Sequence, residues 1–246
     1  MIYNVYNNDK QNWIVLIHCM CGNEHIFDKQ IDTLNKRYNI IIIRLSGHGI
    51  EDNINNAKME SVAEEIYNYL KTNKINKIDI IGLSIGAMIA NIYCEKYPKT
   101  VNKVYLVGMI YRFSWNNLNI LYNILVSIKS FIPRRLYMLF ITYILLPGKM
   151  NKVQRKKLYN VSIKKMKKTY LYSWMEEMNT FIKEANIHIK NMANINAMYI
   201  YGEHDTFFLN YTKRKVNNDK IYIIKNASHI CNYSNPNEFN FLIGGN

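Results

Sequence analysis

The sequence predicts an α/β protein built on a mostly parallel sheet that helices cover on both faces. Short, nearly continuous apolar runs alternate with segments whose apolar residues recur at helical spacing, and the loops between them are short. Strands that are buried on both faces give such continuous runs, because neither face meets water. A second observation is a glycine-flanked serine, Ser84, which stands between one apolar run and the helix-like segment after it. This arrangement is typical of a tight strand-to-helix turn.

The predicted strands and helices follow one another in sequence order. Strands are expected at 13–17, 40–45, 78–83, 104–107, 198–201 and 221–224, where apolar residues dominate. Helices are expected at 27–38, 59–71, 85–97 and 236–243. The second of these helices carries the pattern of a capping box at Ser61 and Glu64, in which two side chains satisfy backbone N–H groups at a helix start.

The alternation breaks between residues 110 and 189. No strand signal appears there, and apolar residues recur at helical spacing over 118–132, 136–146 and 170–182, with interruptions at Pro133 and Pro147-Gly148. We therefore expect a core domain formed by residues 1–109 and 190–246. Residues 110–189 are expected to form a helical cap over the carboxyl ends of the strands, where ligands bind in open α/β sheets.

Charge and cysteine content limit the expected partners and location. The formal net charge of the 246 residues is +14, and much of the excess lies in a lysine-rich stretch at 152–168. We interpret this stretch as a solvated helix face and expect no nucleic acid partner, with peripheral contact between the basic cap and an anionic membrane as the alternative.

Residues 1–8 lack the pattern of a secretory signal, and the apolar stretch 136–146 is too short to span a bilayer. A cytoplasmic protein is expected. Its four cysteines, Cys19, Cys21, Cys94 and Cys231, are therefore expected to stay reduced.

The pentapeptide Gly82-Leu83-Ser84-Ile85-Gly86 has the context of a nucleophile elbow. It follows a predicted strand and opens a predicted helix. Side chains two residues before and after Ser84 would collide in so tight a turn, which explains both glycines. Ser84 would then stand at the tip, where the N–H groups and dipole of the helix favour negative charge.

A serine nucleophile needs a base and an acid that orients the base, and both follow in the sequence. Asp205 ends the segment Tyr201-Gly202-Glu203-His204-Asp205 after one predicted strand, and His229 lies just beyond the last one. The order serine, aspartate, histidine, each at the carboxyl edge of a strand, is the order found in α/β hydrolases.

On these motifs the chain resembles the α/β-hydrolase superfamily over nearly its whole length, and most of all its cap-bearing esterases, lipases and thioesterases. The resemblance implies that Ser84 is the nucleophile, His229 the general base and Asp205 the acid. An earlier acid position used by some members falls in Gly108-Met109-Ile110-Tyr111-Arg112, which has no carboxylate. His204 is interpreted as a loop residue.

The segment His18-Cys19-Met20-Cys21-Gly22 resembles the superfamily's His-Gly-x-x-Gly loop. By this resemblance, the backbone N–H groups of Met20 and Ile85 would form the oxyanion hole. Cys19 replaces a glycine of the pattern, so its β-carbon is expected to restrict the backbone and narrow the pocket floor. A metal site made of His18, Cys19, Cys21 and His25 is disfavoured, because such crowded ligands would have to wrap one ion within a single turn.

Other polar residues near these motifs are given structural interpretations. His48 belongs to a glycine-and-histidine loop at 45–49 that resembles a border of the pocket, and Asp79 lies inside a predicted strand. Tyr201 and Tyr233 are candidates to flank the triad.

The expected function is hydrolysis of a carboxylic ester or thioester with an apolar acyl group, through an acyl-enzyme on Ser84, with no metal or organic cofactor. The Leu, Ile, Phe, Tyr and Met content of the cap suggests the apolar acyl group. Three alternatives remain open at this point. They are acyl transfer, C–C bond hydrolysis or lyase chemistry on the same triad, and ligand binding without catalysis.

Overall fold

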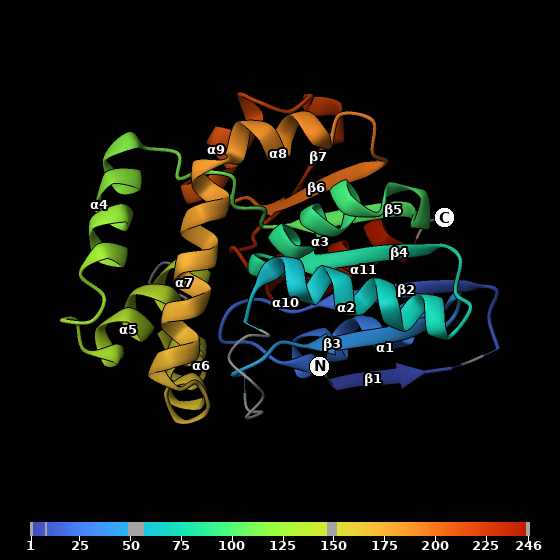
Figure 1. Cartoon of the computed structure of the whole chain (residues 1–246), viewed down its shortest axis with the longest axis horizontal. Coiled ribbons are helices and arrows are strands. Elements are labelled where there is room, and N and C mark those ends of the chain that lie inside the picture. Colours follow the sequence, from blue (N-terminus) through green and yellow to red (C-terminus); the bar gives the residue numbers. More distant parts are fainter. Residues whose placement is uncertain (1, 8, 49–56, 147–151, 245–246) are drawn as a thin grey trace.

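A seven-stranded sheet forms the centre of the computed structural model, which describes residues 2–7, 9–48, 57–146 and 152–244 (Figure 1). The strands lie in the order β1-β3-β2-β4-β5-β6-β7. Only β1 runs antiparallel to its neighbour, β3, and the other pairs are parallel. The bounds are β1 Ile2–Tyr6, β2 Asn12–Ile17, β3 Tyr38–Arg44, β4 Ile78–Leu83, β5 Val101–Val107, β6 Ala197–Gly202 and β7 Ile221–Ile224.

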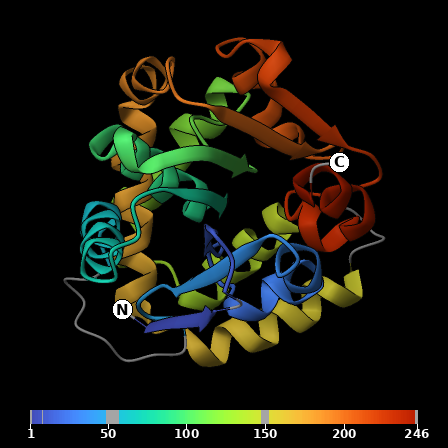
Figure 2. The same ribbon diagram turned by 90° about the vertical axis from the view of Figure 1, so that its right-hand side faces the viewer.

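Helices cover both faces of the sheet, and Figure 2 shows them on either side of the strands. Alternate residues of β2 belong to different cores. Val15 and Ile17 pack with α2 (Met59–Thr72) and α3 (Ile85–Lys96), whereas Ile14 and Leu16 pack with α1 (Asp28–Leu34) and α11 (Pro236–Gly244). Side chains alternate across a strand, so two buried faces demand an unbroken apolar run. The prediction of a mostly parallel sheet between helices is confirmed.

Between β5 and β6 the chain forms the helices α4 Asn116–Ser127, α5 Arg134–Leu145, α6 Lys152–Lys165, α7 Lys168–Lys183 and α8 Ala185–Asn191. In Figure 1, α4, α5 and α6 lie beyond one end of the sheet, and α7 stands between α4 and the strands. α8 instead lies against α3, where His188 Nδ1 is 2.8 Å from Glu95 Oε1. The exact cap limits, 110 and 189, remain a prediction.

The structure corrects several predicted elements. β1 and the short helices α9 Thr206–Lys213 and α10 Cys231–Ser234 were not predicted, nor were the 3-10 turns η1 Glu24–Phe27, η3 Pro98–Thr100 and η4 Asn218–Lys220. The capping box is wrong, because α2 begins at Met59 and so places Ser61 inside its first turn. The Met59 N–H donates instead to Glu177 Oε2 of α7, at 2.9 Å. Pro147-Gly148 lies outside the described residues.

Within the described ranges, we find no helix with the length and apolar character that crossing a membrane requires.

Candidate active site

Ser84 occupies a strained turn between β4 and α3. Its φ is 55° and its ψ is −111°, a backbone conformation that side chains other than glycine rarely adopt. A β-carbon on Gly82 would lie 2.3 Å from the carbonyl oxygen of Gly86, and one on Gly86 would lie 2.2 Å from the carbonyl oxygen of Ile17. The turn therefore requires both glycines, and the pentapeptide adopts the geometry of a nucleophile elbow.

Asp205 and His229 are brought together from two neighbouring strand ends. Asp205 follows β6 at the start of α9, and His229 follows β7. His229 Nδ1 lies 2.7 Å from Asp205 Oδ2, and each side chain is only 1% exposed. A carboxylate can only accept, so Nδ1 is the donor, and in a neutral imidazole with this tautomer Nε2 is the acceptor.

The His229 ring is held between a glycine and an aromatic ring. A β-carbon on Gly108, at the end of β5, would lie 2.8 Å from Cε1 of His229. Phe208 of α9 packs its ring 5.0 Å from the imidazole, centre to centre. Among the described residues, the buried Nε2 of His229 has no hydrogen-bond partner, so no hydrogen bond joins it to Ser84. Such contacts are often long before a substrate is bound.

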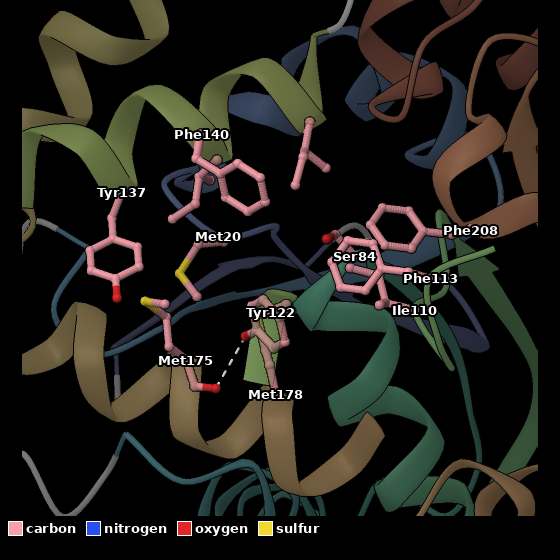
Figure 3. Close-up of a pocket in the computed structure, with 12 residues that line it drawn as sticks. Met20, Ser84, Ile110, Phe113, Tyr122, Tyr137, Phe140, Met175, Met178 and Phe208 are labelled. Atoms are coloured by element: carbon pink, nitrogen blue, oxygen red, sulfur yellow. Dashed lines mark hydrogen bonds between the residues drawn. The ribbon is translucent and has the colours of Figure 1, made fainter. Parts of the chain in front are cut away.

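An apolar cavity of about 50 Å³ opens at Ser84 (Figure 3). Its walls come from α4, α5, α7, α9 and the loops at the strand ends. Among the described residues, no charged side chain lines the cavity, and its walls are formed by Met20, Ser84, Ile110, Phe113, Tyr122, Tyr137, Phe140, Ile141, Ile144, Met175, Met178 and Phe208. Because Phe208 lines this cavity and also packs on His229, Ser84 and His229 border the same region.

The hydroxyls of the cavity wall differ in their partners. Tyr122 donates to the Met175 carbonyl at 3.2 Å, drawn as a dashed line in Figure 3, and Tyr137 donates to the Leu125 carbonyl. Within the described part of the chain, Ser84 supplies the lining hydroxyl that forms no hydrogen bond to protein. It is therefore the hydroxyl available to a bound molecule.

The loop after β2 differs from its prediction at Cys19. The Cys19 side chain is buried in the core with α1 and α11 and does not line the cavity, so the expectation that it narrows the pocket floor is wrong. The next residue, Met20, lines the cavity, and Cys21 has the positive φ, 63°. Ile85 begins α3, so its N–H is one of those without an acceptor inside the helix. The two oxyanion donors, Met20 and Ile85, stay a prediction.

Residues of α5 and α6 hold this loop, and no local pattern in the sequence predicted these contacts. The Ser162 hydroxyl of α6 donates to the Cys21 carbonyl oxygen at 3.2 Å. The Cys21 thiol lies 3.6 Å from the sulfur of Met138 in α5. Helices α5 and α6 therefore contact the residue next to Met20 directly.

His18 and His48 form a buried pair beneath the loop, with ring centres 4.9 Å apart. His18 Nε2 accepts the Leu45 N–H at 3.0 Å, and Nδ1 lies 2.9 Å from the Cys19 carbonyl oxygen. Burial lowers the pKa of His18 to about 4 and that of His48 to about 3. Both imidazoles are neutral near pH 7, and the bonds of His18 tie the loop to the end of β3.

Burial also raises the pKa of the Cys19 and Cys21 thiols to about 12, so neither is a thiolate near neutral pH. In the described ranges, no three His, Cys, Asp or Glu side chains are grouped closely enough to hold a metal ion. Gly49 of the predicted 45–49 loop lies outside those ranges.

The remaining candidates lie away from the cavity. Asp79 accepts the Tyr38 hydroxyl at 2.7 Å within the sheet. The Tyr201 hydroxyl donates to the Met109 carbonyl at 2.8 Å. Tyr233 lies beneath the Lys29 ammonium, 4.4 Å from the ring centre. Neither Tyr201 nor Tyr233 lines the cavity, and His204 is an exposed loop residue, as expected.

Comparison of the sequence and the fold with those of known proteins identifies similar proteins. A family model described as alpha/beta hydrolase fold matches residues 12–126. None of the curated proteins matches the sequence. The enol-lactonase of Burkholderia xenovorans is a similar solved structure, with a TM-score of 0.78 at 16% identity over 98% of this chain and 94% of that one.

Two further solved structures are similar. One is from a study of carboxylesterases of Nitrososphaera gargenis, with a TM-score of 0.74 at 16% identity over 99% of this chain and 92% of that one. The other is an acetate-bound mutant of the meta-cleavage product hydrolase of Pseudomonas fluorescens, with a TM-score of 0.71 at 18% identity over 98% and 92% of the two chains. The family match, together with the shared fold of these hydrolases, supports an enzyme of the hydrolase type.

Proposed function

Because this chain belongs to the α/β-hydrolase superfamily, we propose that it is a serine hydrolase that cleaves a carboxylic ester or thioester with an apolar acyl group. One observation carries the proposal. Ser84 stands at a strained elbow and opens on an apolar cavity, and the wall of that cavity packs against His229, which the buried Asp205 orients at 2.7 Å.

In the first step, the Ser84 oxygen attacks the acyl carbon while His229 Nε2 takes the hydroxyl proton. The carbonyl electron pair moves to oxygen, and the N–H groups of Met20 and Ile85 stabilise the charge that develops there. Asp205 holds the imidazole in the required tautomer and stabilises the imidazolium. The tetrahedral intermediate then collapses, and His229 gives its proton to the departing alcohol or thiol.

In the second step, water attacks the acyl-enzyme. His229 Nε2 takes a proton from the water as its oxygen bonds to the acyl carbon, and the second intermediate expels Ser84, which regains its proton. The products are a carboxylic acid and an alcohol or thiol. Neither step needs a metal or an organic cofactor.

The cavity supports an uncharged, apolar acyl group. Its wall offers aromatic, aliphatic and thioether side chains and no cation to neutralise a carboxylate. Met20, Met175 and Met178 are flexible side chains that can adjust to different acyl shapes. We assign this acyl-binding role to the helices of the proposed cap, residues 110–189, and we keep a small-molecule substrate and a cytoplasmic location as part of the proposal.

The test compares two serines and two histidines. Ser84→Ala is expected to lower the rate on p-nitrophenyl butyrate by about 1,000-fold or more without changing thermal unfolding by more than a few degrees. Ser61→Ala, a change in α2 away from the cavity, should keep the wild-type rate. His229→Gln should lose activity to a similar extent, and His204→Gln, next to Asp205 but exposed, should not.

A fluorophosphonate probe adds a chemical readout, since it should label the wild type and not Ser84→Ala. A folded Ser84→Ala protein that keeps more than about a thousandth of the wild-type rate would overturn the assignment of the nucleophile. Wild type that resists the probe and cleaves no ester would instead indicate ligand binding without catalysis. Transfer of the acyl group to an added alcohol in preference to water would identify an acyltransferase.

A further inference from the structure

The positive charge of the chain is concentrated in one segment. Residues 111–170 contain no aspartate or glutamate, and their lysines and arginines, most of them at 129–168, account for nearly all of the formal excess of +14. The rest of the chain is close to neutral. The segment spans α4, α5 and α6, so the charge belongs to the part of the molecule beyond the end of the sheet (Figure 1).

The same helices expose apolar side chains. Ile120 and Ile124 of α4 and Ile128, directly after its last residue, recur every fourth residue. Leu136, Leu139 and Tyr143 lie at helical spacing along one face of α5. Phe131, in the turn between the two helices, is 88% exposed. We call these seven residues the α4–α5 apolar surface. In Figure 1 this turn protrudes on the side away from the strands.

A groove on this surface adjoins the candidate active site. It has a volume of about 300 Å³ and is lined by Leu125, Phe131, Ile132, Pro133, Leu136, Tyr137 and Phe140. Tyr137 and Phe140 also line the cavity at Ser84. The two hollows therefore share a wall made of these two side chains.

Cations border the apolar surface. The Arg155 guanidinium lies 5.2 Å from the ring centre of Tyr143, and the Lys168 ammonium lies 3.4 Å from the carbonyl oxygen of Ser130, next to Phe131. Lys152, Lys156 and Lys164 are exposed on α6, which packs against α5. An apolar face edged by lysine and arginine is the pattern of helices that lie in the interface of an anionic membrane.

We propose that the α4–α5 apolar surface docks on an anionic lipid bilayer, with Phe131 and its neighbours among the acyl chains and with Lys168 and the cations of α6 at the headgroups. The groove then faces the lipid, so the substrate is an acyl ester carried by the membrane. This second part rests on the proposed serine hydrolase function. A nucleic acid would pair with the cations but would leave the aliphatic side chains of α4 and α5 in water, whereas a bilayer matches both.

Vesicle co-sedimentation tests the docking. Wild type should bind vesicles of phosphatidylcholine with about 30% phosphatidylserine at low salt, bind neutral vesicles far more weakly, and lose binding as salt screens the charges. Phe131→Ser should weaken binding about tenfold or more, whereas Phe241→Ser, which changes an exposed phenylalanine on α11, should leave it unchanged.

Two triple lysine variants distinguish the effect of the α6 lysines from the effect of the overall net charge. Lys152→Gln, Lys156→Gln and Lys164→Gln together should weaken binding to anionic vesicles by more than tenfold, at about fivefold for each lysine near the surface. The matched control replaces Lys36, Lys71 and Lys99 by glutamine, three exposed lysines outside residues 110–189. This variant loses the same total charge and should bind the vesicles almost as wild type does.

Equal effects of Phe131→Ser and Phe241→Ser, equal binding to neutral and anionic vesicles, or binding to DNA without binding to vesicles would each overturn the docking. Ser84→Ala keeps the docking surface and should bind vesicles like wild type. Docking without Ser84-dependent hydrolysis would refute the proposed serine hydrolase function and support the membrane-docking surface. Ser84-dependent hydrolysis without docking would support the proposed function and refute the docking surface.

For the substrate, the informative quantity is the ratio of the rate on an ester held in anionic vesicles to the rate on a soluble short ester. Phe131→Ser should lower this ratio, and Phe241→Ser should not. A ratio that is the same for both variants and for wild type would refute a membrane-borne substrate.

Discussion

Replacing Gly108 by alanine should displace the candidate general base without removing any of its hydrogen-bonding atoms. Gly108 has a φ of 58°, and the added β-carbon would lie 2.8 Å from Cε1 and 3.0 Å from Nδ1 of His229. The imidazole has little room to retreat. Phe208 packs near it, and Asp205 holds Nδ1 at 2.7 Å.

The size of the effect follows from these distances. Two carbons in contact lie about 3.5 Å apart, so the ring of His229 must move by about 0.7 Å. A displacement of about 1 Å in a catalytic group can cost about 100-fold in rate, and we expect a loss of about 30- to 100-fold here. Stability should fall by about 1–2 kcal/mol, because alanine is disfavoured at positive φ, and the melting temperature by about 2–8 °C.

The assay is hydrolysis of p-nitrophenyl butyrate by Gly108→Ala, with thermal unfolding and the rate of fluorophosphonate labelling measured on the same preparation. Gly244→Ala is the matched control, since its β-carbon would meet only the side chain of Thr33, at 3.2 Å, far from the cavity. Folded Gly108→Ala with a rate within about threefold of wild type would show that His229 does not act from its observed position.

Two further predictions concern the loop after β2. Ser162→Ala removes the bond to the Cys21 carbonyl and should lower kcat on p-nitrophenyl butyrate about three- to tenfold with little change in KM. The control, Ser127→Ala at the end of α4, should leave kcat unchanged. A change confined to KM would contradict a positioning role for Ser162. The buried, neutral His18 and His48 have pKa values below the unfolded value of about 6.5, so the unfolded chain binds more protons below that pH. The free energy of unfolding, measured by urea titration, should therefore fall as pH drops from about 7 toward 4, and a constant value between about pH 7 and 5 would refute this.

The sequence predicted the parts of the fold in which burial is two-sided. The apolar runs of β2 to β6 mark strands, because residues such as Ile14 and Val15 face different cores. β7 is an edge strand with Tyr222 and Ile223 exposed, and its unbroken apolar run alone predicted it. β1 was missed because it is an edge strand whose Val5 and Tyr6 are exposed, which leaves no continuous apolar run. The start of α2 was misplaced because Glu177, far along the chain, caps it in place of a local side chain.

The candidate site divides in the same way. Ser84, Asp205 and His229 could be predicted because each stands at a strand end in a local pattern of sequence. Phe208 and Ser162 act through contacts between segments far apart in the chain, which no spacing encodes. Cys19 was misjudged because its position in the motif does not reveal which way its side chain points.

The backbone conformation at Ser84 lowers the stability of the fold while it positions the candidate nucleophile. A non-glycine residue at a φ of 55° costs on the order of 1–3 kcal/mol, a noticeable share of the 5–15 kcal/mol that typically separates folded from unfolded protein. Glycine at this position would relieve the strain and remove the hydroxyl at once. Selection for thermostability alone would therefore favour glycine at this position. A serine is expected to persist there only where selection also acts on the hydroxyl group.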